Sequence, residues 1–290
     1  METTTKTHLC ISIFYSKKKW NELICECLSP FLKRNADVIY SYSITFSTAQ
    51  GENIQVLINC FNGFICQREL DNALSLYLKD NPSVLEDNAP EKDSLFVNFP
   101  NNKHLYGLFK PPRLKHGDSN ELINHNFQVL ISKSIVSKLS QSPINQERIL
   151  IFGIYIQCVV FKVIFDKNKL IANNIKEITN TFMQTLPIDA QVSVELRCLF
   201  VQRTHAGELN ILFNQMWLNS AVTTDFKWLH DLSRELRDLL ATTEKTNELS
   251  VTLLKLLFEQ LDLRSNHYIA LSSNLNYHLV LLMLYVKKML

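Results

Sequence analysis

The first eighty residues alternate between the hydrophobic pattern of strands and that of helices. Runs rich in β-branched and aromatic residues are typical of strands, and apolar residues spaced three or four apart are typical of helices packed on one side. These patterns predict three strands, at 8–15, 38–46 and 54–60, and two helices, at 17–32 and 67–78. The turn 49–53 contains Gly51, so we expect the second and third strands to form a hairpin.

The segment 81–117 has a different composition. It contains five of the eight prolines, many Asn, Asp and Lys residues, and only short apolar pieces. We therefore expect a long loop without regular structure, which in a compact protein is usually functional, mobile or a boundary between subdomains.

From residue 120 onward the hydrophobic spacing predicts helices alone. Their ranges are 121–139, 146–165, 170–186, 193–219, 226–243, 249–263 and 268–290. We therefore predict an α+β fold. An N-terminal mixed α/β portion with a small sheet, residues 1–117, precedes a predominantly helical portion, residues 118–290, and we expect the whole to pack as one compact unit.

Composition and charge exclude several classes of protein. The chain has 290 residues, 46% of them hydrophobic, with Lys+Arg 30 against Asp+Glu 28. Such a chain is globular, and its near-neutral charge gives no overall attraction to nucleic acid. The apolar stretches 149–165 and 279–286 are too polar or too short for a membrane span. The six glycines are scattered and form none of the common nucleotide-binding or hydrolase signatures.

The seven cysteines indicate a reducing compartment. Their number is odd, no pair has the C-x-x-C spacing, and the chain starts with a polar segment rather than a signal peptide. We therefore expect a cytoplasmic protein with free thiols. His spacing does not complete a zinc site either, so we predict no metal.

Four short motifs stand in one order along nearly the whole chain. They are Gly51-x-Asn53-Ile-x-Val56, the segment from Asn102 to Tyr106-Gly107, a helix with Phe127 and Ser132, and the segment Ser273-Asn-Leu-Asn276-Tyr-His278. In this order, together with the opening strand and helix, the chain resembles the C-terminal domain of lantibiotic dehydratases. That family also exists as stand-alone thiopeptide-type bacteriocin biosynthesis proteins.

The resemblance implies maturation of a ribosomally made peptide. In this family a partner esterifies Ser or Thr hydroxyls of the precursor with glutamate from glutamyl-tRNA, and the C-terminal domain eliminates the glutamate. A sister group joins two of the resulting dehydroamino acids into a pyridine ring. The expected partners are thus a precursor peptide and a separate glutamylating subunit, with no cofactor and no direct contact with nucleic acid.

The chain departs from the family pattern at its charged positions. The two Arg of the turn-strand motif become Gln55 and Leu57, and the Glu and Arg of the next motif become Asn102 and Leu105. The C-terminal His becomes Asn276, and the Asn-Arg that follows it becomes Val280-Leu281. Because Leu carries no charge and Asn no titrating proton, two hypotheses stay open. The chain is a divergent lyase, or it is a catalytically degenerate relative that binds the precursor or acts as a scaffold.

These considerations select the candidate residues. As catalytic groups we predict His278, Tyr106 and His104. As peptide-binding groups we predict Asn53, Gln55, Lys103 and Asn276. The less specific interpretations are a packed or exposed helix position for His278, a solvated loop for His104 and an outward-facing strand position for Gln55.

The two hypotheses predict different geometries. The lyase hypothesis predicts a polar, titratable cleft where Gln55, His104, Tyr106 and His278 converge. A binding subunit would have them scattered, or the cleft plugged by Leu57, Leu105 and Leu281. In either case an extended precursor could add as a strand to the sheet formed by 38–46 and 54–60, which needs no charged residue. A soluble interaction protein outside peptide biosynthesis is the third alternative.

Overall fold

The computed structural model describes residues 7–48, 50–84, 98–111, 119–165 and 226–262, with isolated positions between 177 and 207. It has two compact units. The first unit comprises Met1–Ile149 with Gln260–Asp262, and the second comprises Leu150–Glu259 with Leu263–Leu290. The fold is α+β, as predicted, with helices joined to a small antiparallel sheet.

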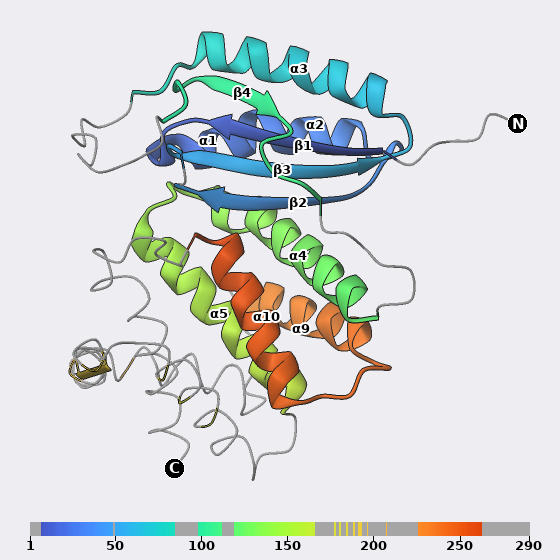
Figure 1. Ribbon diagram of the computed structural model, residues 1–290, viewed down its shortest axis with the longest axis vertical. Helices are drawn as coiled ribbons and strands as arrows, with labels where there is room; N and C mark the ends of the chain where they lie inside the picture. The colour runs from blue at the N-terminus through green and yellow to red at the C-terminus, as the bar shows by residue number, and fades with distance from the viewer. Residues whose placement is uncertain are drawn as a thin grey trace, which may run out of the picture. The chain divides into compact units, whose positions relative to one another are not determined.

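The sheet lies in the first unit and has four strands in the order β2-β3-β1-β4 (Figure 1). Their bounds are β1 Thr7–Phe14, β2 Ile39–Ser47, β3 Asn53–Cys60 and β4 Lys103–Tyr106. Each neighbouring pair is antiparallel, so the expected β2–β3 hairpin is confirmed. Strand β4 corrects the expectation that 81–117 lacks regular structure, because it pairs with β1 at the edge of the sheet.

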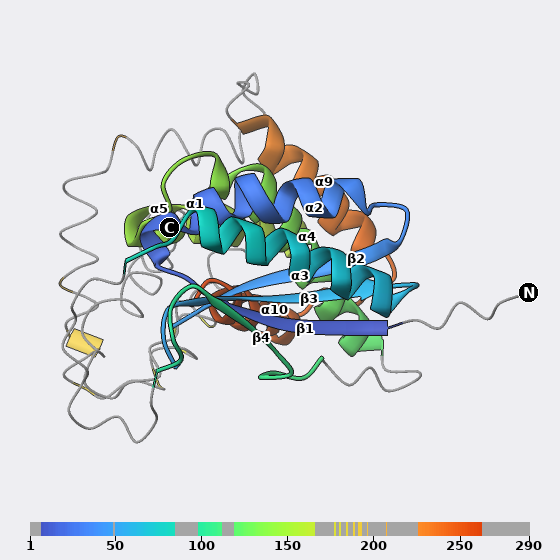
Figure 2. The ribbon, with the colours of Figure 1, turned by 90° about the horizontal axis from the view of Figure 1, so that it is seen from above.

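One face of the sheet carries the apolar residues predicted for buried strands. Ile11, Val56 and Ile44 lie side by side on three strands and none of them is exposed. Helices α1, α2 and α3 lie on one side of the sheet (Figure 2). Trp20 of α1 stacks on Phe46 of β2 with ring centroids 4.8 Å apart, which joins helix and sheet in one core.

The predicted helix 17–32 is present but irregular. It consists of a 3₁₀ turn, η1 (Lys17–Lys19), then α1 (Trp20–Glu22), a π-helical turn, η2 (Leu23–Leu28), and α2 (Ser29–Arg34). The N–H of Ser29 bonds the carbonyl of Ile24, five residues back. Pro30 follows directly and has no N–H to donate, so a wider turn before it costs the helix little.

The remaining described helices match their predicted ranges within a few residues. They are α3 Gly63–Asp80, α4 Ser119–Ser137, α5 Gln146–Ile164, α9 Lys227–Leu239 and α10 Asn247–Gln260. In the second unit, Phe152 of α5 stacks on Trp228 of α9 with centroids 5.7 Å apart. The predicted helices 170–186, 193–219 and 268–290 lie wholly or largely outside the described residues. No helix in the described part of the chain is long and apolar enough to cross a membrane.

Candidate functional site

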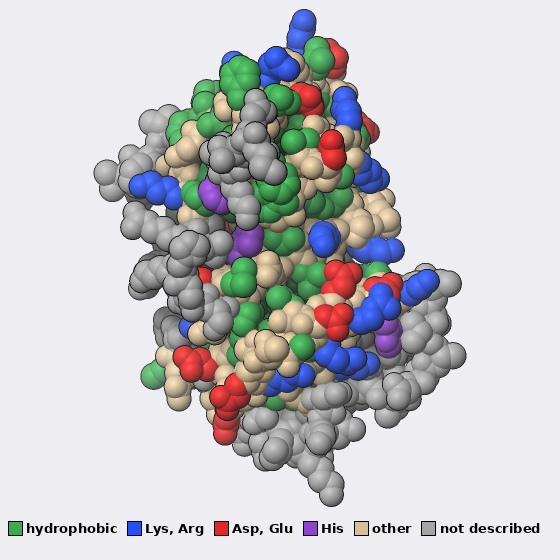
Figure 3. Space-filling view, turned by 90° about the vertical axis from the view of Figure 1, so that its right-hand side faces the viewer, with side chains coloured by type: hydrophobic (Ala, Val, Ile, Leu, Met, Phe, Trp, Pro, Cys, Tyr) green, Lys and Arg blue, Asp and Glu red, His purple; other side chains and the backbone are tan. Residues whose placement is uncertain are grey.

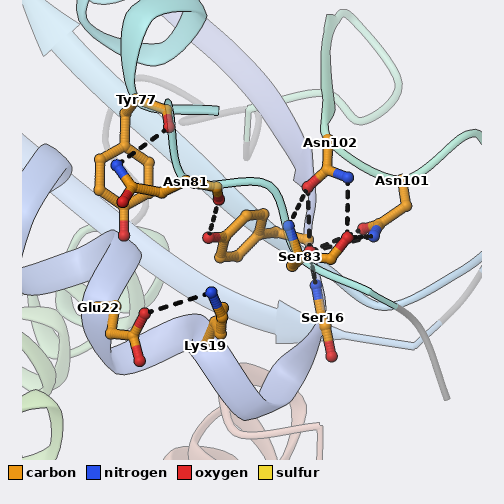
Figure 4. A network of polar contacts seen from close by, with 9 residues as sticks. Ser16, Lys19, Glu22, Tyr77, Asn81, Ser83, Asn101 and Asn102 are labelled. Atoms are coloured by element: carbon orange, nitrogen blue, oxygen red, sulfur yellow. Dashed lines mark hydrogen bonds and ion pairs between the residues drawn. The ribbon is translucent and has the colours of Figure 1, made fainter. Parts of the chain in front are cut away.

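The start of β4 is held by a network of amide and hydroxyl groups (Figure 4). The Asn102 side chain accepts from the N–H of Ser83 at 2.8 Å and donates to its carbonyl at 2.9 Å. Asn101 donates to the same carbonyl at 2.8 Å, and the Ser83 hydroxyl accepts from the N–H of Ser16 at 3.0 Å. Because Ser83 follows α3 closely in the chain, these bonds fix β4 relative to α3.

Two backbone conformations delimit β4. Asn102 before it and Gly107 after it have positive φ values of 58° and 75°. Asn is among the few residues with a side chain that tolerate this region, and Gly enters it without strain. The N–H of Asn102 bonds Phe14, and that of Gly107 bonds Cys10, so both ends of the strand are attached to β1.

Strand β4 presents His104 and Tyr106 to Asp71 of α3. The Tyr106 hydroxyl donates to Asp71 Oδ1 at 2.7 Å, and His104 Nε2 lies 3.1 Å from the same oxygen. The two rings meet edge to face, with centroids 6.2 Å apart. We call these three residues the Asp71 cluster. The side chains of His104 and Asp71 are 18% and 37% exposed, so a ligand can reach them from solvent.

The electrostatics of the Asp71 cluster fix the roles of its protons. Burial, followed by the hydrogen bond to Asp71 and its charge, raises the pKa of Tyr106 far above its usual value, so the phenol keeps its proton. A carboxylate only accepts, so the short contact assigns the proton of the imidazole to Nε2. In the neutral imidazole the lone pair is then on Nδ1, the arrangement of a base oriented by a carboxylate.

The structure brings together two of the predicted site residues and separates others. His104 and Tyr106 share the Asp71 cluster, and His104 lies on a strand rather than in the solvated loop of the simpler interpretation. Lys103 and Gln55 point to the opposite face of the sheet, because side chains alternate along a strand. Asn53 is buried and donates to the Gly51 carbonyl at 2.8 Å. His278 and Asn276 lie outside the described residues.

The opposite face of the sheet carries a second polar group, which we call the His125 cluster (His8, Ser41, Asn59 and His125). Asn59 of β3 accepts from His8 Nδ1 at 2.5 Å and donates to the Ser41 hydroxyl at 2.7 Å. It also lies 3.4 Å from Nε2 of His125 on α4. Burial, and then the nearby His8, lower the pKa of His125, so this imidazole is neutral and accepts from Asn59.

On the same face as the His125 cluster, two residues of the sequence motifs lie on either side of β1. Gln55 and Leu105 both lie beside Ser12 of β1, which separates them. Ser12 is buried, and its hydroxyl has no hydrogen-bond partner in the described structure. Leu57 is buried two residues further along β3. Gln55 therefore belongs to a different surface from His104 and Tyr106, and these three do not converge.

Sequence reasoning missed Asp71, His8 and His125. Asp71 lies on a predicted helix, but nothing local distinguishes it from a surface carboxylate. The spacing of the histidines gave no signal, because a strand and a helix far apart in the chain bring His8 and His125 together. Among the described residues no group of three His, Cys, Asp or Glu side chains could hold a metal ion, and the described cysteines are free thiols.

Comparison with solved structures gives the fold a context. The structure superposes on a protein described as the pyridine synthase TbtD from thiomuracin biosynthesis, with a TM-score of 0.65 and 12% identity over 94% of this chain and 96% of that one. It also matches TsrL, with a TM-score of 0.60 and 10% identity over 98% of this chain and 96% of that one. No protein-family model matches the sequence, and no curated protein matches it significantly. At these identities the likeness establishes a shared fold.

Proposed function

We propose that this chain acts in the maturation of a ribosomally made peptide, and that the Asp71 cluster performs proton transfer on that peptide. Two observations of different kinds support the proposal. The sequence motifs resemble the lantibiotic dehydratase C-terminal domain, and the fold matches a pyridine synthase of thiomuracin biosynthesis over nearly the whole of both chains. Both enzyme types act on peptides that carry modified Ser or Thr residues.

The observation that carries the catalytic proposal is the contact between Asp71 and His104. In elimination, a base removes the α-proton of a glutamylated residue, the C–H electrons form the Cα=Cβ bond, and glutamate leaves as its carboxylate. Nδ1 of His104 is the group in the Asp71 cluster that accepts this proton. The imidazolium that results is stabilised by the Asp71 carboxylate 3.1 Å away.

Tyr106 supplies a protonated hydroxyl beside the proposed base His104. Its raised pKa keeps the hydroxyl protonated at neutral pH, so it can serve as a hydrogen-bond donor and acceptor but not as the base. The Asp71 cluster itself contains no Lys or Arg, and the side chain of Lys103 lies on the other face of the sheet. The cluster is therefore suited to moving a proton rather than to binding the departing carboxylate.

A specific observation favours the alternative, a peptide-binding subunit without catalysis. Leu57 and Leu105 stand where the family has Arg, and Leu57 is buried at the sheet rather than facing a ligand. Without those cations, a glutamate leaving group loses the bidentate partners that Arg provides. Under this alternative, the chain binds the precursor and a partner subunit carries out the chemistry.

Mass spectrometry of the modified peptide separates the two functions. The precursor is incubated with its glutamylating partner, with and without this chain, and glutamate adducts and dehydrated product are followed in time. Conversion of adducts only in the presence of the chain establishes catalysis. Persistence of the adducts, or equal conversion without the chain, establishes the binding role.

Three variants then assign the proton transfer. Replacing a general base typically lowers a rate about 100-fold or more, so His104→Gln should slow conversion by at least that factor. Asp71→Asn should reduce it less, because the imidazole remains but loses its orienting charge. Asp80→Asn on the same helix is the matched control, since Asp80 is exposed and far along α3 from Asp71. Equal rates for His104→Gln and Asp80→Asn would exclude the Asp71 cluster from catalysis.

A further inference from the structure

We propose that the outer edge of β4 binds an extended segment of the substrate peptide as an added strand, and so places one of its side chains beside the Asp71 cluster. The inference rests on the proposed function for the identity of the occupant. It concerns a surface that neither the motifs nor the fold comparison assigns.

The opposite edge of the sheet, at β2, is already occupied. The main-chain N–H of Ile44 donates to the Ser132 hydroxyl of α4 at 2.8 Å, and its carbonyl accepts from the Gln260 side chain at 2.9 Å. Strand β3 lies between β2 and β1 and has no edge. A peptide added to the sheet at 38–46, as expected from the sequence, would therefore have to displace the bonds of Ile44, and 54–60 has no free edge.

The β4 edge has the groups that an added strand requires. The bond from Gly107 to Cys10 defines a hydrogen-bonded pair, and in an antiparallel ladder the next such pair toward the start of β4 is Leu105 with Ser12. His104 and Tyr106 alternate with these residues, so their main-chain N–H and C=O groups point away from β1. In the described structure no residue bonds them on that side. Among the described residues, two donors and two acceptors are thus unpaired at strand spacing on this edge.

The register of such a strand connects binding to chemistry. Side chains of residues directly opposite one another in adjacent strands lie on the same face, with Cβ atoms about 4.5–5.5 Å apart. A peptide residue opposite His104 therefore has its side chain on the α3 side of the sheet, next to the imidazole and Asp71. The edge favours an extended occupant without Pro, and the Asp71 cluster is placed to act on the Ser- or Thr-derived side chain at the position opposite His104.

The shortness of β4 also favours a transient peptide over a permanent partner. The strand has four residues, and short edges are a common device against edge-to-edge association of folded proteins. Leu108, two residues past the end of the strand, is 41% exposed and offers an apolar contact for a peptide side chain.

Amide exchange on the full chain tests the proposal. The probe is the tightest 12-residue peptide recovered from a random mRNA-display library selected on this protein. At saturation we expect the amide protons of His104 and Tyr106 to exchange at least tenfold more slowly, and that of Ile44, which is already bonded to Ser132, to keep its rate. Single N-methyl groups along the peptide should weaken binding at least tenfold at alternate positions and less than twofold between them.

The possible outcomes distinguish failure of the β4 edge proposal from failure of peptide binding itself. A bound peptide that leaves the exchange of His104 and Tyr106 unchanged, or that tolerates N-methylation without period two, overturns the edge proposal and leaves peptide binding intact. A library without any binder overturns both. Protection without peptide that grows with protein concentration identifies a second copy as occupant and also overturns it. Tyr106→Phe keeps the main-chain N–H, so it should bind the probe within twofold of the wild type while lowering peptide conversion.

Discussion

Gln260, at the end of α10, donates from its side-chain amide to the main-chain carbonyl of Ile44, a residue 216 positions earlier, at 2.9 Å. The same amide lies 2.9 Å from the carbonyl of Gln128 and 2.7 Å from the Ser132 hydroxyl. Ser132 in turn accepts from Ile44 and donates to Gln128. Gln260 and Ser132 are fully buried, so these bonds replace water at the edge of β2.

Replacing Gln260 by Ala should therefore destabilise the first unit. The carbonyl of Ile44 would be buried without its donor, and an unsatisfied buried group costs about 1–3 kcal/mol. We expect the free energy of unfolding, from urea titration followed by fluorescence, to fall by about 2 kcal/mol, with a further loss from the cavity.

Gln128→Ala is the matched control for this prediction. Its main-chain carbonyl takes part in the network, but its side chain makes none of the described hydrogen bonds and is only half-buried. The same amide is removed without breaking a bond, so the expected loss is below about 0.5 kcal/mol. Equal losses for Gln128→Ala and Gln260→Ala would contradict the role assigned to Gln260.

The close approach of α3 to β1 predicts an intolerance at Gly63. A Cβ atom at this position would lie 2.8 Å from Cβ of Thr7, a distance that real side chains do not reach. Gly63→Ala should lower the free energy of unfolding by about 1–3 kcal/mol, even though Ala is the better helix former. Thr7→Gly in the same chain removes the clash and should restore most of the loss. A double variant as unstable as Gly63→Ala alone would exclude the steric explanation.

The bond between Tyr106 and Asp71 predicts a change in titration. Burial is the main cause of the raised pKa of Tyr106, and the hydrogen bond to Asp71 and its charge add to it. Asp71→Asn should therefore lower the pKa of Tyr106 and still leave it above that of an exposed tyrosine. Ultraviolet absorbance reports the ionisation of all tyrosines. The curve of Tyr106 alone is obtained by subtracting the titration of Asp71→Asn with Tyr106→Phe from that of Asp71→Asn. A midpoint for Tyr106 equal to that in the wild type would show that Asp71 does not contribute to its raised pKa.

The sequence predicted the strands and helices that carry their own hydrophobic pattern. Strands β1, β2 and β3 were expected within a residue or two of their bounds, because β-branched and aromatic residues recur along them. The α+β fold followed from the order of these elements. The residues at 17–32 were expected as one regular helix, and the π-helical turn before Pro30 was missed because its hydrophobic spacing is that of an ordinary helix.

The site depended on pairing that local patterns do not encode. Strand β4 has four residues among prolines and asparagines, and it exists because β1 supplies its hydrogen-bond partners. His104 and Tyr106 were singled out from the motif, whereas Asp71 became significant only when β4 was placed beside α3. Gln55, expected to share a cleft with His104, lies on the other face of the sheet, because strand pairing decides which side chains share a face.

The His125 cluster predicts that stability falls in mild acid. Burial lowers the pKa of His125 in the folded protein, so below the ordinary value of 6.5 the unfolded chain binds this proton more readily. The contribution of His125 to stability is thus present above about pH 6.5 and is lost as the pH falls through its folded pKa. His125→Gln should flatten the decline of unfolding free energy between pH 7 and pH 5, measured in urea. An unchanged slope would place the proton uptake elsewhere.

Asp262 should act in the opposite direction. Burial raises its pKa from 3.8 to about 6, against the lowering effects of hydrogen bonds from Thr48 and the charge of Lys17. A carboxyl with a raised folded pKa contributes stability below its unfolded value and loses it as the pH rises through about 6. At pH 7.5 the buried charge is therefore unfavourable.

Asp262→Asn removes that charge and keeps the shape of the side chain. Allowing for partial exposure, we expect the variant to be more stable than the wild type by about 1 kcal/mol at pH 7.5 and equally stable at pH 4. Because His125 and Asp262 shift stability in opposite directions between pH 4 and pH 7, their effects partly cancel in the wild type, and Asp262→Asn should expose the decline in mild acid that His125 causes. A variant Asp262→Asn that is less stable at pH 7.5 would mean that the bonds with Thr48 outweigh the cost of burial.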